Sequence, residues 1–413
     1  MLDSLQLRGY RFYWFSALLV AAARAMQGVV LGWLVLERTN SAFLVTLAGA
    51  LNFLPMLGLG LFSGIIADRL NRRKLLISAQ IVSATFWALL GVLIVTNVVQ
   101  TWQIMAISLV VGTAWAIDWP CRQLIIADLA GEQNILNGIA LDQWAFNLMG
   151  VIGSIVAGVV ITTVGMGNAF YIVAGFFAFA GVSLFAIGPT KQTRIGSTHK
   201  VAANISEGIK YVLSKRVIFG VLLIMMVAHL TLFPFRSLLA VFARDVLHKG
   251  AEGFGLLSAG PGVGAIIGGL VMASLRRSRL SIKALTIGGV AMALLGAVFA
   301  LSQTYLLSVF LLAACGVATS IYGALQNSMP LRLAEPQMRG RIMGLLSLVV
   351  GLMPLGMMAF GEITDRIGAP AVTIGGSIIG AVLITGIFLF VPGLRQSARS
   401  PQPQPAQPSL PKP

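Results

Sequence analysis

The chain has 413 residues, of which 57% are hydrophobic and 10% are charged, and its formal net charge is +16. A soluble domain needs charges on roughly a quarter of its residues, so this composition excludes a soluble globular protein. The basic residues fall in separate loops between apolar stretches instead of along one continuous surface, which argues against a nucleic-acid-binding protein.

Twelve apolar stretches are each long enough to cross a hydrocarbon core of about 30 Å as a helix of roughly 20 residues. They do not alternate every second residue, as the strands of a membrane barrel would, so we predict an all-α membrane protein. The first apolar stretch continues to Leu36, beyond the length of about 7–15 residues typical of the apolar part of a signal peptide, so we interpret it as a membrane span. The predicted spans lie near 12–36, 43–66, 75–97, 102–124, 138–162, 167–188, 217–243, 254–274, 284–302, 305–327, 342–361 and 371–391.

The loops between these spans differ strongly in charge. Of the 29 lysines and arginines, 23 fall on the side that carries both termini and four on the other side. The positive-inside rule then places both termini in the cytoplasm, which agrees with an even number of spans. We expect a multi-pass protein of the plasma (inner) membrane. Cys121 and Cys315 fall within spans, so we expect free thiols.

The longest polar and basic connection separates six spans from six. Shifting the sequence by 205 residues places Arg72 on Arg277 and Arg24 on His229, which supports a duplicated architecture. Parallel six-helix halves with a central site are a recurrent plan among transporters. The predicted parts are an N-terminal half 1–188, a cytoplasmic linker 189–216, a C-terminal half 217–391 and a disordered Pro-rich tail 392–413.

A charged turn separates the second and third spans and reads Gly64-Ile-Ile-Ala-Asp68-Arg69-Leu-Asn71-Arg72-Arg73. The glycine permits close helix packing, the acid can meet a helix N-terminus, and the bases can pair with acids on neighbouring helices. Topology alone would explain the basic residues but not Gly64 or Asp68, so we favour a gating role.

This turn resembles the signature G-x-x-x-D-R-x-G-R-R of the major facilitator superfamily. The segments 118–129, 238–257 and 339–356 are similar to a bacterial branch that includes drug-efflux-like and siderophore-exporter-like proteins. The resemblance implies twelve helices in two halves, with Asp68 facing the start of helix 11 and Arg72 paired with Asp128. Asp142 lies one turn into helix 5 and close to Arg122, so we add both to the gate. The expected cytoplasmic gate comprises Gly64, Asp68, Arg69, Asn71, Arg72, Arg73, Arg122, Asp128 and Asp142.

The chain departs from the superfamily pattern in several places. Asn71 takes the second glycine position, for which we expect a left-handed backbone. Helix 4 lacks the mid-span arginine of many proton-driven exporters, Ser154 stands where the antiporter motif has proline, and the turn 269–277 has no acid. The sequence therefore leaves open whether export is coupled to protons or not. The stretch 361–368 repeats the turn pattern at the outer end of helix 11, where we interpret it as a lookalike or an outer latch.

Charged side chains inside spans are functional candidates because burial in lipid is costly. The helical rise places Arg24 roughly 20 Å along its helix from Arg11 and Asp118 roughly 15 Å from Asp128, so the two can meet. We predict an Arg24–Asp118 pair that serves coupling, substrate contact or static structure. The other candidates are His229 as a proton carrier or a backbone-bonded histidine, Arg236 as an outer-face arginine, and Trp115, Trp119 and Trp144 as cavity-lining residues.

The sequence contains no H-E-x-x-H, G-x-S-x-G or phosphate-loop motif, so we expect neither an enzyme nor a metal or cofactor. We predict a secondary active transporter that exports a small amphipathic or anionic compound by alternating access, with proton exchange as an option. A channel, a lipid or lysophospholipid flippase and a metabolite importer of the same fold are the alternatives. The expected partners are the substrate, a proton or other ion gradient and the bilayer, with no nucleic acid and a monomeric state.

Overall fold

The computed structural model describes residues 3–131, 134–188, 201–274, 281–391 and 393–397. Within these ranges the structure describes only the backbone of 3, 60–69, 136, 201–206, 273, 336 and 396–397. All regular elements of the described chain are helical, and twelve segments are long and apolar enough to span a membrane. The prediction of an all-α protein with twelve spans is therefore confirmed.

The first six spans are single helices. They are α1 (Arg8–Thr39), α2 (Ala42–Arg69), α3 (Arg72–Val95), α4 (Thr101–Ala130), α5 (Ile135–Val164) and α6 (Met166–Phe185), and a short 3-10 helix, Asp3–Gln6, precedes them.

Two spans in the second part are interrupted. The seventh consists of α8 (Arg216–Thr231), the 3-10 helix η2 (Pro234–Leu238), α9 (Leu239–Val241) and the π-helical η3 (Phe242–Val246), and the eleventh consists of α13 (Arg339–Gly351) and α14 (Met353–Ile367). The other spans are α10 (Ala251–Ser274), α11 (Ile282–Leu301), α12 (Tyr305–Leu333) and α15 (Ala369–Phe390). Both interruptions lie beside prolines, Pro234 and Pro354, which lack an amide donor and cannot continue the backbone ladder.

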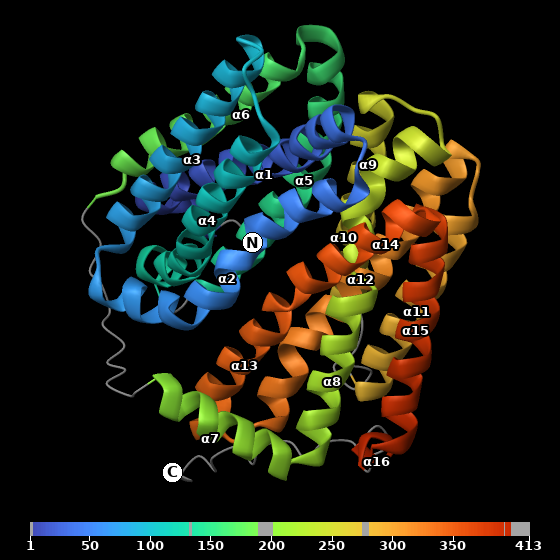
Figure 1. The fold of residues 1–413 in the computed structure, drawn as a ribbon. Coiled ribbons are helices and arrows are strands. Elements are labelled where there is room, and N and C mark those ends of the chain that lie inside the picture. The colour runs from blue at the N-terminus through green and yellow to red at the C-terminus, as the bar shows by residue number, and fades with distance from the viewer. Residues whose placement is uncertain (1–2, 132–133, 189–200, 275–280, 392, 398–413) are drawn as a thin grey trace.

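Two bundles lie side by side in Figure 1, one formed by α1–α6 and the other by α8–α15. They meet through α5 against α10 and α2 against α14. We call the end with the helix boundaries Arg8 and Arg72 the terminal face, and the end with Thr39 and Ala42 the distal face. The bundles meet near α9 and diverge toward α7 (Figure 1).

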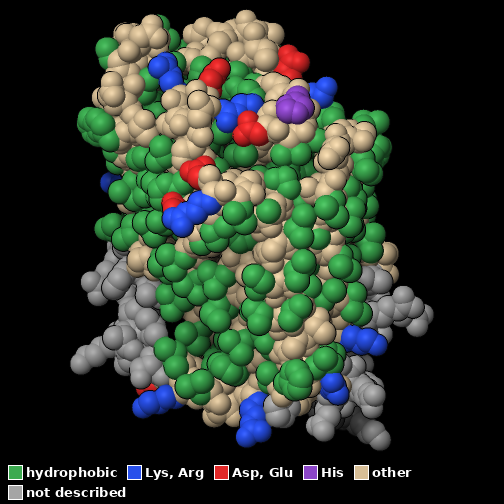
Figure 2. Space-filling view, turned by 45° about the vertical axis from the view of Figure 1, so that its right-hand side comes forward, with side chains coloured by type: hydrophobic (Ala, Val, Ile, Leu, Met, Phe, Trp, Pro, Cys, Tyr) green, Lys and Arg blue, Asp and Glu red, His purple; other side chains and the backbone are tan. Residues whose placement is uncertain are grey.

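The face drawn in Figure 2 is largely apolar over its middle, with basic side chains at its lower end and both acidic and basic side chains in its upper part. Large hydrophobic side chains such as Leu270, Phe179 and Phe390 are 70%, 67% and 84% exposed. Such a continuous apolar surface is stable only in contact with lipid.

The segment predicted as a loop between the halves contains the helix α7 (Val201–Ser214), while 189–200 lie outside the described residues. Arg341 of α13 forms an ion pair with Glu207, and Lys215 pairs with Glu335 at 3.2 Å, so the helix is attached to the second bundle.

The prediction of a disordered tail over 392–413 is wrong for residues 394–397. Residues 394–397 form the short helix α16, whose Leu394 is buried, because this side chain packs close to Gly220 of α8. Residues 392 and 398–413 lie outside the described part of the chain.

Candidate functional site

The turn between α2 and α3 is fixed by its asparagine. Asn71 has a φ of −66°, so the left-handed conformation expected there is wrong. Instead, its side-chain oxygen accepts a hydrogen bond from the amide of Lys74 at 3.2 Å and caps α3. An N-cap needs a short side chain with an acceptor and an extended backbone, which asparagine provides.

The arginines after Asn71 connect the turn to two other helices. Arg72 Nη1 donates to both carboxylate oxygens of Asp128 at 2.9 and 2.7 Å, and both side chains are 2% exposed. Arg73 donates to the carbonyls of Leu184 and Phe185, which end α6. The expected Arg72–Asp128 pair is thus present, whereas the side chains of Gly64, Asp68 and Arg69 lie outside the described part and their roles stay predictions.

A buried polar network lies deeper in the first bundle. Asp118 accepts a hydrogen bond from Gln80 Nε2 at 2.6 Å and forms an ion pair with Arg122, whose Nε lies 2.7 Å away. The hydroxyl of Tyr13 donates to Asp142 Oδ1 at 3.1 Å. Network members come from α1, α3, α4 and α5, so these contacts hold the first bundle together.

The predicted Arg24–Asp118 pair is wrong. Arg122, one turn along the same helix, reaches Asp118 first, and Gln80 takes the other oxygen. The Arg24 guanidinium instead lies over the ring of Trp115, 4.1 Å from its centroid. A helical rise measures depth but not direction around the helix axis, so the spacing could not exclude this arrangement.

A central cavity of about 720 Å³ lies between the two bundles. Its lining includes Arg24, Trp115, Arg236 and the polar side chains Gln143 and Asn327. Trp119 is outside this lining and packs against Trp115, with ring centroids 5.4 Å apart, and Trp144 is 49% exposed. Of the three tryptophans, the structure therefore places Trp115 on the cavity.

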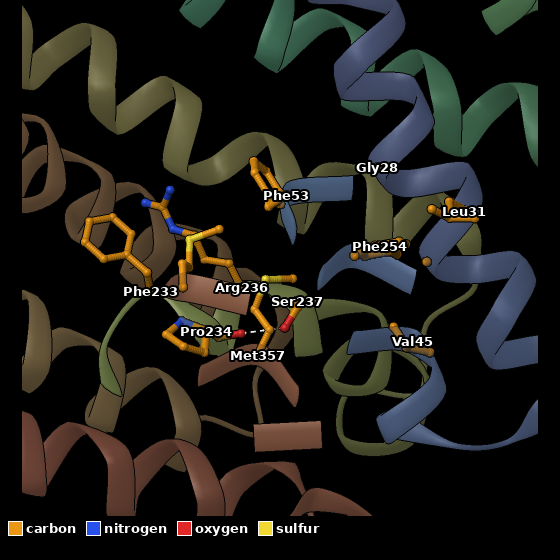
Figure 3. Close-up of a pocket in the computed structure, with 13 residues that line it drawn as sticks. Gly28, Leu31, Val45, Phe53, Phe233, Pro234, Arg236, Ser237, Phe254 and Met357 are labelled. Carbon is orange, nitrogen blue, oxygen red and sulfur yellow. Dashed lines mark hydrogen bonds between the residues drawn. The ribbon is translucent and has the colours of Figure 1, made fainter. Parts of the chain in front are cut away.

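From its position in the sequence we expected Arg236 to extend to the outer face. In the structure it does not. Its Nη2 donates to Thr319 Oγ1 at 3.2 Å, and its guanidinium lies 5.9 Å from the ring centroid of Phe233. The interruption at Pro234 turns η2 toward the interface, where Arg236 and Phe53 line both the central cavity and a smaller one of about 320 Å³ (Figure 3).

His229 is buried within the second bundle, and it is absent from the linings of both cavities. Its Nδ1 lies 2.9 Å from the carbonyl of Met225, and its ring stacks on Phe233. The backbone-bonded alternative therefore describes its position better than a proton carrier facing the cavity.

Three described side chains of the second bundle form hydrogen bonds to the first bundle near the distal face. Asp365 of α14 accepts hydrogen bonds from Ser41 Oγ at 2.7 Å and from the amide of Ala42 at 2.6 Å, at the start of α2. Arg244 donates to the carbonyl of Leu36 and to Asn40 Oδ1, at the end of α1. Glu252 accepts from Thr162 at 2.7 Å.

The cavity lining reaches Gln143, Met272 and Asn327, which lie toward the terminal ends of α5, α10 and α12. The cavity therefore extends from the interface between the bundles toward the terminal face.

Sequence reasoning missed Tyr13, Gln80, Arg244 and Thr162. Gln80 had a recognisable signal, because an amide inside an apolar span needs a buried partner. Tyr13 and Thr162 had none, since such residues commonly bond to water or to their own helix. Both cysteines are free and buried, as expected. In the described part of the chain no group of three or more metal-binding side chains occurs.

Twelve spans in two bundles around a central cavity define a membrane transporter. The family model described as transmembrane secretion effector matches residues 2–411, so the chain belongs to this family, within the major facilitator superfamily. It is an integral membrane protein of the bacterial plasma membrane and not an enzyme.

Relatives with known names are efflux pumps and transporters. The chain is 25% identical over 401 residues to the multidrug efflux pump Tap of Mycolicibacterium fortuitum, covering 92% of this chain and 95% of that one. It is 20% identical to macrolide efflux protein A of Streptococcus pyogenes, covering 88% and 91%, and 24% identical to the staphyloferrin A transporter of Staphylococcus aureus, covering 92% and 96%.

A solved structure supports the fold. The nucleoside transporter NupG matches with a TM-score of 0.72 at 15% identity, covering 93% of this chain and 99% of that chain. Together the comparisons identify a transporter that exports small compounds.

Proposed function

We propose that this protein is a secondary active exporter that moves small amphipathic or anionic compounds out of the cell by alternating access, in exchange for protons. The observation that carries the proposal is the central cavity between two bundles that are bonded to each other near the distal face. With the terminal face in the cytoplasm, as the basic loops predict, this arrangement would accept a substrate from inside the cell.

Alternating access requires that the distal contacts break as the terminal ends approach. Asp365, Arg244 and Glu252 make short side-chain contacts that such a motion could exchange, whereas Arg72 and Asp128 lie within one bundle and would move as one body. The names of the multidrug and macrolide efflux relatives support the outward direction.

Asp142 is the residue that we propose as the proton carrier. Asp118 and Asp128 both form ion pairs with arginines at 2.7 Å, whereas the contact found for Asp142 is the hydroxyl of Tyr13. A carboxyl group that forms no ion pair can bind and release a proton without breaking one.

Distance measurements between spin labels test the mechanism. One pair, at Lys74 and Arg332, reports on the terminal face, and another, at Glu37 and Lys249, reports on the distal face; all four positions are exposed. An alternating-access exporter should show the terminal distance shortening while the distal distance lengthens when an exported compound and a lower external pH are applied. Two distances that stay constant during flux would instead indicate a channel.

Export itself is tested in cells. Deletion and overexpression strains should differ in susceptibility to toxic compounds and in metabolites released to the medium. Accumulation of a compound in the overexpressing strain would identify an importer, and movement of labelled lysophospholipid between leaflets would identify a flippase.

A further inference from the structure

The charged side chains described on the lining of the central cavity are basic. Two charged side chains, Arg24 of α1 and Arg236 of η2, are among its lining residues, and no aspartate or glutamate belongs to the described part of this lining. The arginines come from different bundles, so the cavity places positive charge on both of its walls.

Arg24 has no carboxylate partner among the described side chains. Its guanidinium rests on Trp115, and the nearby Asp118 has both oxygens engaged by Gln80 and Arg122. A guanidinium carries five N–H donors, so the cation–π contact with Trp115 leaves this donor capacity free for another group.

Arg236 is also without an acidic partner in the described structure. It makes one hydrogen bond, to the hydroxyl of Thr319, and a contact with the ring of Phe233. In Figure 3 its guanidinium points away from Pro234.

Uncompensated cations at membrane depth are unfavourable unless water or an anionic ligand compensates them. Guanidinium groups bind carboxylate and phosphate oxygens in a two-pronged geometry that an ammonium group lacks. The remaining described lining is apolar or carries amides and hydroxyls, with Phe53 and Phe146 among the rings and Asn147 and Asn327 among the amides.

We infer that the cavity binds amphipathic organic anions, whose carboxylate or phosphate group is held between Arg24 and Arg236 and whose apolar body lies against Phe53 and Phe146. The inference rests on the proposed exporter function and names its substrate class. It also predicts discrimination, because a cationic compound of the same size would meet two like charges.

Binding to the purified full-length protein in detergent tests the site without requiring transport. The probes are compounds of one shape and different charge: 2-naphthoate, 2-naphthyl phosphate, neutral 2-naphthamide and the cation 2-naphthylmethylammonium. Equilibrium dialysis gives each affinity, and thermal melting shows that each variant is folded.

We expect the naphthoate or the phosphate ester to bind at least about tenfold more tightly than the amide, and the cation to bind more weakly still. Arg24→Gln and Arg236→Gln should each lower the affinity for the anion by about tenfold or more, whereas Arg24→Lys should lose less. The matched control is Arg366→Gln, since Arg366 is exposed and lies outside the cavity. The tighter of the two anions identifies the preferred head group.

Equal or tighter binding of the amide or the cation would overturn the inference, as would an unchanged affinity in both glutamine variants or no binding of either anion. If a glutamine variant does not fold, the charge preference of the unaltered protein decides. Anion binding by a protein that does not export would support the anion site and refute the exporter function. Preferred binding of the cation by an active exporter would support the exporter function and refute the anion site.

Discussion

The carboxylate of Asp365 accepts a hydrogen bond from the backbone amide of Ala42 at 2.6 Å, and this contact crosses from the second bundle to the first. The amide belongs to the first residue of α2, so the acid caps a helix of the opposite bundle with hydrogen bonds and favourable charge. The outer repeat of the charged turn pattern, in 361–368, therefore occupies a position where a distal latch would act.

Replacing Asp365 with Asn should weaken this latch. The amide group can still accept a bond but loses the charge, which we expect to cost the distal-closed state about 1 kcal/mol, or roughly a fivefold shift in population. Spin labels at Glu37 and Lys249 should then report a larger distal-open fraction. Glu362→Gln is the matched control, because Glu362 bonds to Arg366 of its own helix; an equal shift in both variants would contradict the latch.

The Arg72–Asp128 pair should behave as a structural connection within the first bundle. Asp128→Asn removes the buried ion pair with Arg72, which we expect to destabilise the protein by about 3–5 kcal/mol. The double replacement Arg72→Gln with Asp128→Asn should recover part of this loss. Thermal melting in detergent measures both changes. A double variant no more stable than Asp128→Asn would show that the Arg72–Asp128 ion pair does not account for the loss of stability.

Asp142 and Asp118 should respond differently to loss of charge. Asp142→Asn should fold normally but lose the dependence of transport on pH, because a carboxamide cannot exchange the proton. Asp118→Asn should instead lower the melting temperature, since Arg122 would be left as an uncompensated buried charge. Export measured across a range of pH gradients separates the two; a pH response retained in Asp142→Asn would remove it as the proton carrier.

The fold could be predicted because the bilayer constrains both the length and the composition of each span. The positions of all twelve spans agree with the structure to within several residues at their ends. Span ends were harder to place, because helices such as α1 and α4 continue through polar residues beyond the apolar core.

The site was less predictable because depth along a helix does not fix the direction of a side chain. Arg24 and Asp118 lie at compatible depths, yet Arg122 on the same helix as Asp118 forms the ion pair. Arg236 was misplaced for a different reason: the α-helix gives way to the 3-10 helix η2 at Pro234, and the sequence does not show in which direction such a break points the side chain two residues later. Arg72 with Asp128 was predictable because the resemblance supplied the partner.

The packing of α5 against α10 yields a last prediction about the distal contact. A side-chain carbon added at Gly255 would lie 2.6 Å from the carbonyl oxygen of Ser154, and one at Gly158 would lie 2.7 Å from the carbonyl oxygen of Ala251. Neither helix backbone can yield without moving its bundle, so Gly255→Ala should push the bundles apart at the distal face. We expect a larger distal-open fraction from the Glu37–Lys249 labels and reduced export, with near-normal melting. Gly250→Ala is the matched control, because nothing lies within 4 Å of the added carbon there. If Gly255→Ala leaves both the label distances and export unchanged, this close contact does not hold the distal face closed.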